Sequence, residues 1–125
     1  MSYAMKIAHC VGPDFALYSG NDDITVPLMS IGGSGVISVY ANVMPAMCHH
    51  IVADYLSGNQ AQAVANLLRY LRVMNDLFIE VNPIPVKAAM NMMGLNVGPM
   101  RLPLCEMSAE HSAVLRASLE EAGLL

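Results

Sequence analysis

The fold of this chain is decided by one stretch, Phe15-Ala16-Leu17-Tyr18-Ser19-Gly20-Asn21-Asp22-Asp23, with its continuation Gly32-Gly33-Ser34-Gly35-Val36-Ile37-Ser38-Val39-Tyr40-Ala41-Asn42-Val43. Residues 15–18 are strand formers that stop at a cluster of turn residues. Residues 36–43 are a second run rich in β-branched side chains, entered through glycines. Residues 24–31 have room for about two helical turns, with Asp22 or Asp23 as the expected N-cap. Strand, helix and strand in this order predict a βαβ unit with two parallel strands.

The rest of the chain is predicted to be helical. We expect a helix over residues 2–11 that Gly12-Pro13 ends, and a second helix from Pro45 that Gly58 ends. Asn59 and Gln62 form the pattern of a capping box at the start of a long helix, which Asn82-Pro83 interrupts. A short helix over 86–93 and a last helix over 109–122, capped by Ser108, complete the chain.

Four segments carry a family resemblance: Ser19-Gly20-Asn21-Asp22-Asp23, Gly32-Gly33-Ser34-Gly35-Val36-Ile37-Ser38-Val39, Asn82-Pro83-Ile84-Pro85-Val86-Lys87 and Arg101-Leu102-Pro103-Leu104. In sequence, order and spacing they resemble the C-terminal part of the dihydrodipicolinate synthase family, from about residue 7 to residue 125. N-acetylneuraminate lyase, a relative on the same scaffold, fits the last two segments less well. The resemblance implies a (β/α)8 barrel and a pyruvate-dependent class I lyase of lysine biosynthesis.

The length of 125 residues allows one domain and is too short for a complete barrel, which needs at least about 200 residues. We therefore expect a mainly helical α/β chain. Residues 1–43 would form a partial barrel segment, the last βαβ unit with its two parallel strands. Residues 44–125 would form a C-terminal helical tail.

The composition is unusually apolar, with 55% apolar and 13% charged residues. A small domain has proportionally more surface, so this chain should expose apolar patches that need a partner. The net charge of −4 and the scattered basic residues argue against a nucleic-acid partner. Apolar runs are too short for a membrane span and no signal-peptide layout is present, so we expect a cytoplasmic protein without membrane contact.

The resemblance implies a lysine that forms a Schiff base with a ketoacid and a tyrosine that relays protons. Both would lie upstream of residue 1 of this sequence. Lys6 and Lys87 are its two lysines, and each is expected to be a surface or packing residue. We expect no catalytic residue in this chain, since the nucleophile that a Schiff-base mechanism needs is missing.

Two substrate-binding residues are implied by the resemblance. Gly20 matches a glycine that lets substrate approach the backbone, and Ile37 matches a residue whose main-chain carbonyl lies near the Schiff-base site. The family often has Asp where Asn21 stands, which puts a carboxylate role at that position in doubt. Gly20 has an alternative explanation, because a turn with positive φ would also require glycine.

Other motifs have structural explanations. Gly32-Gly33-Ser34-Gly35 precedes a strand, whereas a phosphate-binding loop follows one, so we interpret it as a tight connection. His49 and His50 are adjacent and point about 100° apart on a helix, which does not suit a shared metal ion. Three dispersed cysteines are expected to be reduced, and a methionine-rich patch after residue 89 to be packing. We expect no metal and no cofactor.

Three hypotheses follow. In the first, the chain is a truncated homologue that is inactive alone and acts, if at all, as a homo-oligomeric module. In the second, it is the C-terminal half of a split lyase that condenses pyruvate with aspartate semialdehyde, and its partner is a complementary N-terminal half. In the third, it is a piece excised from an intact enzyme. In the first two hypotheses, the pair of parallel strands has unpaired edges, which favours a partner.

Overall fold

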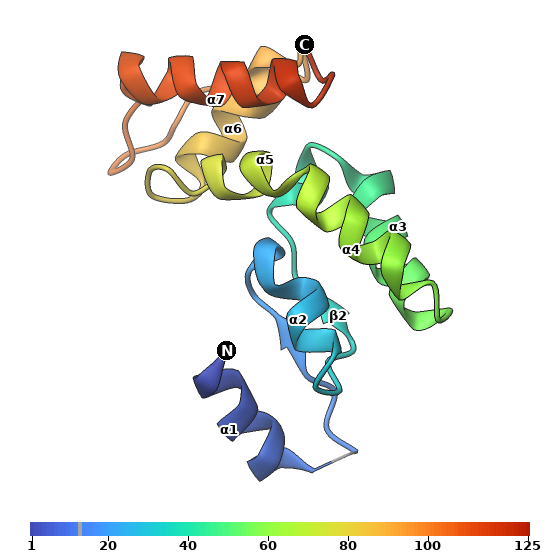
Figure 1. Cartoon of the computed structure of the whole chain (residues 1–125). Coiled ribbons are helices and arrows are strands. Elements are labelled where there is room, and N and C mark those ends of the chain that lie inside the picture. The colour runs from blue at the N-terminus through green and yellow to red at the C-terminus, as the bar shows by residue number, and fades with distance from the viewer. Residues whose placement is uncertain (13) are drawn as a thin grey trace.

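The computed structural model describes residues 1–12 and 14–125 and is mainly helical (Figure 1). Two short strands form one parallel sheet. The elements are α1 (Ser2–Val11), β1 (Tyr18–Ser19), η1 (Asp22–Ile24), α2 (Thr25–Met29), β2 (Gly35–Val36), η2 (Tyr40–Asn42), α3 (Pro45–Leu56), α4 (Gln60–Arg69), α5 (Leu71–Asp76), α6 (Ile84–Met92) and α7 (Ala109–Glu121), where η denotes a 3₁₀ helix. No helix in the described part of the chain is long and apolar enough to cross a membrane.

The sheet confirms the parallel pair but not the strand lengths. Tyr18 pairs with Gly35, and Ser19 pairs with Val36. The prediction of strands over 15–18 and 36–43 was wrong in extent, since β1 begins at Tyr18 and β2 ends at Val36. Residues 40–42 form the 3₁₀ helix η2 instead of continuing the strand. A strand persists only where a neighbour accepts its ladder bonds, and in the described part of the chain each strand has a single neighbour.

The crossover between the strands is a 3₁₀ turn followed by a short α-helix, where the sequence predicted one helix over 24–31. Neither Asp22 nor Asp23 caps it, because the N-caps of η1 and α2 make no side-chain capping bond. The Asp22 carboxylate instead accepts hydrogen bonds from the segment after β2.

The predicted long helix after Asn59 is divided into α4 and α5 at Tyr70. The backbone break accompanies burial of the Tyr70 ring, whose centroid lies 6.3 Å from that of Tyr40. The Arg69 guanidinium lies 5.3 Å from the same ring centroid. The predicted capping box is wrong, because Asn59 makes no side-chain cap and Gln62 donates to Asn66 at 3.1 Å.

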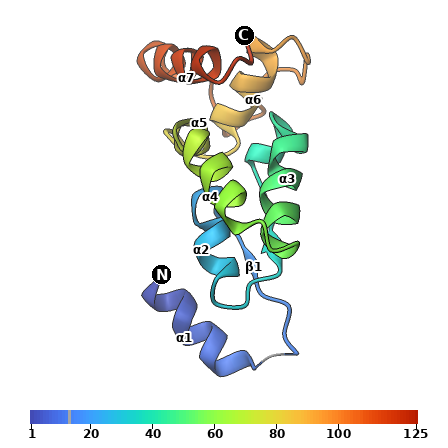
Figure 2. The ribbon, with the colours of Figure 1, turned by 45° about the vertical axis from the view of Figure 1, so that its right-hand side comes forward.

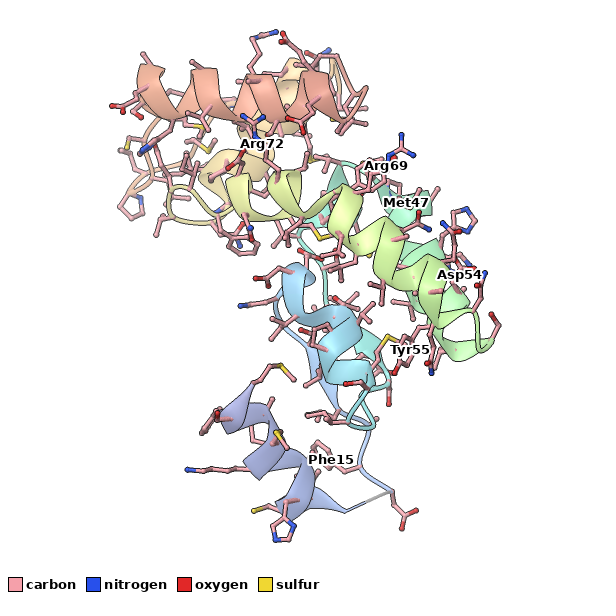
Figure 3. The ribbon with its side chains drawn as sticks, in the orientation of Figure 1. Phe15, Met47, Asp54, Tyr55, Arg69 and Arg72 are labelled. Atoms are coloured by element: carbon pink, nitrogen blue, oxygen red, sulfur yellow. The ribbon has the colours of Figure 1, made fainter. Side chains whose placement is uncertain are left out.

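The core lies among the helices rather than against the sheet. Its side chains come mainly from α3 to α7 and η2, and they include Tyr40, Ile51, Leu67, Leu77, Leu115 and Leu119. Both views show α3 and α4 side by side, with α6 and α7 at the end of the molecule opposite to α1 (Figure 2). Arg72 on α5, labelled in Figure 3, forms an ion pair with Glu121 and so links α5 to α7.

Helix α1 has the predicted bounds but contributes no buried residue. Gly12 follows it with a φ of 75°, and Pro13, the other half of the predicted stop signal, lies outside the described residues. A groove of about 390 Å³ separates α1 from the segment that leads into the sheet. Phe15 lines this groove together with Ala8 and Val11 (Figure 3).

Helix α7 begins with the predicted Ser108 cap, which accepts from the His111 amide. Glu80 supports this start, because its Oε1 accepts from the Ser108 amide at 3.0 Å and from the Ser108 hydroxyl at 2.8 Å. His111 Nδ1 lies 2.8 Å from the same oxygen. The His111 and Ser108 hydrogen bonds lower the pKa of Glu80 below its usual value.

The lowered pKa of Glu80 predicts a pH-dependent contribution to stability. The stabilisation is fully present above the unfolded Glu pKa of about 4.3 and is lost as the pH falls through the lower folded value. Glu80→Gln should therefore lower the unfolding midpoint at pH 7, and this difference should be smaller at pH 3. Thermal unfolding followed by circular dichroism checks it, with Glu120→Gln on the exposed side of α7 as control. An equal difference at both pH values would contradict it.

Candidate functional site

The turn that leaves β1 is held by its own serine. The Ser19 hydroxyl donates to the Asn21 carbonyl at 2.7 Å, and the Asn21 amide donates to Ser19 Oγ at 3.2 Å. Ser19 is buried, whereas Gly20 and Asn21 are exposed. Local side-chain bonds of this kind fix a turn without a regular ladder. Gly20 is thereby presented at the carboxyl end of the strand.

Gly20 is not required by the backbone. Its φ lies outside the positive range, in contrast to glycines such as Gly12 and Gly58. The explanation of Gly20 by a turn with positive φ was therefore wrong. A Cβ built on Gly20 would meet no atom of the described residues within 4 Å. Neither backbone conformation nor packing among the described residues explains why position 20 is a glycine. The space where its Cβ would lie is open.

Ile37 lies one residue beyond the end of β2, not inside a long strand as predicted. Its amide donates to the Ser19 carbonyl at 2.8 Å, so the pairing continues to this position. Its side chain is 72% exposed. Because the strands are parallel, Gly20 and Ile37 lie next to each other at the same end of the sheet. The structure thus brings the two predicted substrate-binding residues together.

Asp22 is a buried acid that the sequence interpretation had assigned to a helix cap. Its carboxylate accepts from the Ser38 hydroxyl and from the amides of Val39 and Tyr40, at 3.1 Å and 3.0 Å for the amides. The partners lie 16 to 18 residues along the chain. No local pattern reveals such a contact, since capping motifs span only a few residues.

A cavity of about 180 Å³ opens beside this turn. Its lining combines side chains of the turn with residues of α5 and of the segment just after it: Asn21, Asp22, Asp23, Met74, Asn75 and Phe78. It lies at the carboxyl end of the strands, where ligands bind in parallel α/β sheets.

Two groups under this turn stay neutral near pH 7. Burial raises the pKa of the Tyr40 phenol, and the pKa of the Cys48 thiol is also raised, chiefly by burial. Tyr40 donates its hydroxyl hydrogen to Met44 Sδ at 2.9 Å. Neither group is arranged as a nucleophile, because the reactive form of a thiol is the thiolate.

The two lysines do not reach the strand ends. Lys6 lies exposed on α1. Lys87 lies on α6, where its Nζ donates to the Pro99 carbonyl at 2.6 Å and ties the helix to the following loop. The described residues include no group of three or more His, Cys, Asp or Glu side chains placed to hold a metal ion.

Comparison with known proteins gives consistent matches over the chain. The model of the dihydrodipicolinate synthetase family matches residues 1–122. The 4-hydroxy-tetrahydrodipicolinate synthase of Clostridium perfringens is 47% identical over 125 residues, which are 100% of this chain and 43% of the relative. That of Acetivibrio thermocellus is 50% identical over 113 residues, 90% of this chain and 39% of the relative. The chain thus spans less than half the length of these relatives.

Comparison with solved structures points to the same family as the sequence matches. Dihydrodipicolinate synthase from Cyanidioschyzon merolae, solved with lysine bound, has a TM-score of 0.91 at 39% identity over 99% of this chain and 42% of its own. The chloride-inhibited synthase from Acinetobacter baumannii, complexed with pyruvate, has a TM-score of 0.91 at 34% identity over 98% of this chain and 42% of its own. These helices and strands therefore superimpose on part of the synthase structures. The chain belongs to the dihydrodipicolinate synthetase family.

Proposed function

We propose that residues 1–125 supply part of the active-site wall of a dihydrodipicolinate synthase, a pyruvate-dependent Schiff-base lyase, and are inactive on their own. Residues 1–43 would be the last βαβ unit of the barrel, and residues 44–125 its C-terminal helical tail. The observation that carries the proposal is the juxtaposition of Gly20 and Ile37 at the carboxyl end of two parallel strands. Barrel enzymes of this architecture bind substrate at that end.

The proposed role of Gly20 is to leave room for pyruvate against the backbone, and that of Ile37 is to present its main-chain carbonyl. The open space beside Gly20 supports the first role. The bond from the Ile37 amide to the Ser19 carbonyl supports the second role, because it ties the main chain of Ile37 to β1. Neither residue supplies a nucleophile. Condensation needs an amine that attacks the ketone carbon and expels water, and that amine must be desolvated or otherwise activated.

The amine is proposed to come from a lysine outside residues 1–125, because Lys87 is bound to a carbonyl on α6 and Lys6 lies on a helix without buried residues. The same reasoning supports a partner. Tyr18 and Ile37 are 51% and 72% exposed, and each strand has one neighbour in the described residues. The unpaired strand edges and these exposed side chains would be covered by the complementary N-terminal part of a barrel or by a second copy of this chain.

The test uses the part of the Clostridium perfringens synthase that lies outside the match, called here the complementary segment. Consumption of pyruvate and aspartate semialdehyde is measured for residues 1–125 alone, for the complementary segment alone and for the two together or fused. We expect turnover only when both are present. Turnover by residues 1–125 alone would overturn the proposal that they are inactive, and no turnover by the folded fusion would overturn their role in the site.

A further inference from the structure

The Asp22 carboxylate joins the two halves of the candidate site. It is 3% exposed and accepts three hydrogen bonds: from the Ser38 hydroxyl, the Val39 amide and the Tyr40 amide. Its own main chain is held as well, because the Thr25 hydroxyl donates to the Asp22 carbonyl at 2.8 Å. A buried carboxylate with this many donors is a rigid anchor, since each charge-assisted bond is stronger than a neutral one.

These bonds close a small ring of backbone around Gly20 and Ile37. On one side of the pair, the Ile37 amide donates to the Ser19 carbonyl at 2.8 Å. On the other side, the Asp22 carboxylate accepts hydrogen bonds from Ser38 and Val39, which follow Ile37. The Ser38 hydroxyl adds a second tie, because its oxygen accepts from the Ala41 amide at 2.8 Å. Gly20 and Ile37 are each enclosed between two anchored positions.

We infer that Asp22 is a positioning residue that fixes the distance between Gly20 and the main-chain carbonyl of Ile37. The inference rests on the proposed function, which gives those two groups to the pyruvate site. Asp22 would transfer no proton and touch no substrate. It would hold the backbone that follows the Ile37 amide, because the bond from that amide to the Ser19 carbonyl constrains only the near side of Ile37.

The charge and shape of aspartate are both needed for this task. Oδ2 faces two backbone N–H donors, and Oδ1 faces a hydroxyl donor. Asparagine has one oxygen and an amide group that is itself a donor. Asp22→Asn therefore places a donor against donors or gives up one set of bonds, and a buried donor without an acceptor is costly.

The experiment has one readout in the 125-residue chain and one in its complex with the complementary segment. In the chain, amide hydrogen exchange by NMR should be at least about tenfold faster at Val39 and Tyr40 in Asp22→Asn, because bonds to a charged group are lost. In the complex, borohydride trapping should need at least about tenfold more pyruvate for half-saturation, the effect expected of a misplaced contact. Asp54→Asn removes the same charge on α3, outside the candidate site, and should change neither quantity.

A purely structural role would lower the unfolding midpoint without altering the half-saturating pyruvate concentration of the folded complex. Ser38→Ala removes one of the three donors and keeps the experiment decisive should Asp22→Asn fail to fold, since it should shift both readouts in the same direction by less. Unchanged exchange at Val39 and Tyr40, or an unchanged half-saturating concentration in a complex that traps pyruvate, would overturn this inference alone. A wild-type complex that traps none would overturn the proposed function and the role of Asp22 with it.

Discussion

Replacing Gly20 with alanine should abolish most pyruvate capture and leave the fold intact. The added methyl group meets no atom of the described residues within 4 Å, and the φ of Gly20 suits any residue. The unfolding free energy should therefore change by less than about 0.5 kcal/mol. If the open side of Gly20 is where pyruvate lies, trapping in the complex should fall on the order of 100-fold, because a displacement of about 1 Å in a site has that effect.

Gly33→Ala is the matched comparison, since it adds the same methyl group at a tightly packed position instead of an open one. A Cβ on Gly33 would lie 2.8 Å from the Leu28 carbonyl oxygen, so the backbone must shift. We expect a loss of stability of about 1–3 kcal/mol. Urea unfolding and borohydride trapping of both variants check the pair. Normal trapping by Gly20→Ala would contradict the assignment of Gly20 to the pyruvate site.

The second large effect should come from Leu67→Ala. Leu67 on α4 is 5% exposed and belongs to the central cluster of buried side chains. Truncating a buried leucine removes transfer free energy and leaves a cavity, which together cost about 2–5 kcal/mol. Because domains of this size are stable by only about 5–15 kcal/mol, the variant should lose a large share of its stability.

The neighbouring Leu68 provides the control for this change, because it has the same side chain on the same helix but is 60% exposed. Leu68→Ala should alter the unfolding free energy by less than about 0.5 kcal/mol in dilute solution. Chemical denaturation of the two variants measures the difference. Equal losses in both would show that the core does not lie where the helices place it.

Helix positions with local signals could be predicted from the sequence. The first helix, α1, has the expected bounds, and Ser108 caps α7 as expected, because a cap bond joins residues three apart. The break at Tyr70 could not be predicted. It accompanies burial of Tyr70 near Tyr40, a residue far away in the sequence, and no local pattern marks such a contact.

The candidate site was predicted in part. The parallel pairing was predicted, but the predicted second strand put Ile37 near its start, whereas in the structure β2 ends at Val36 and Ile37 lies beside Gly20. The second strand was predicted too long, because residues 36–43 have strand-forming side chains whose local preference is overridden. Asp22 binds the amides of Val39 and Tyr40, and the chain turns into η2 at that point. That contact joins residues far apart in the sequence, so no local sequence pattern predicts it.

The most direct measurement is the location of the pyruvate adduct after borohydride reduction, by mass spectrometry of peptides from residues 1–125 alone and from their complex with the complementary segment. We predict no adduct in the chain alone and, in the complex, an adduct on a lysine of the complementary segment. An adduct on Lys6 or Lys87 of the chain alone would contradict the account, because it would show that these 125 residues carry their own Schiff-base nucleophile.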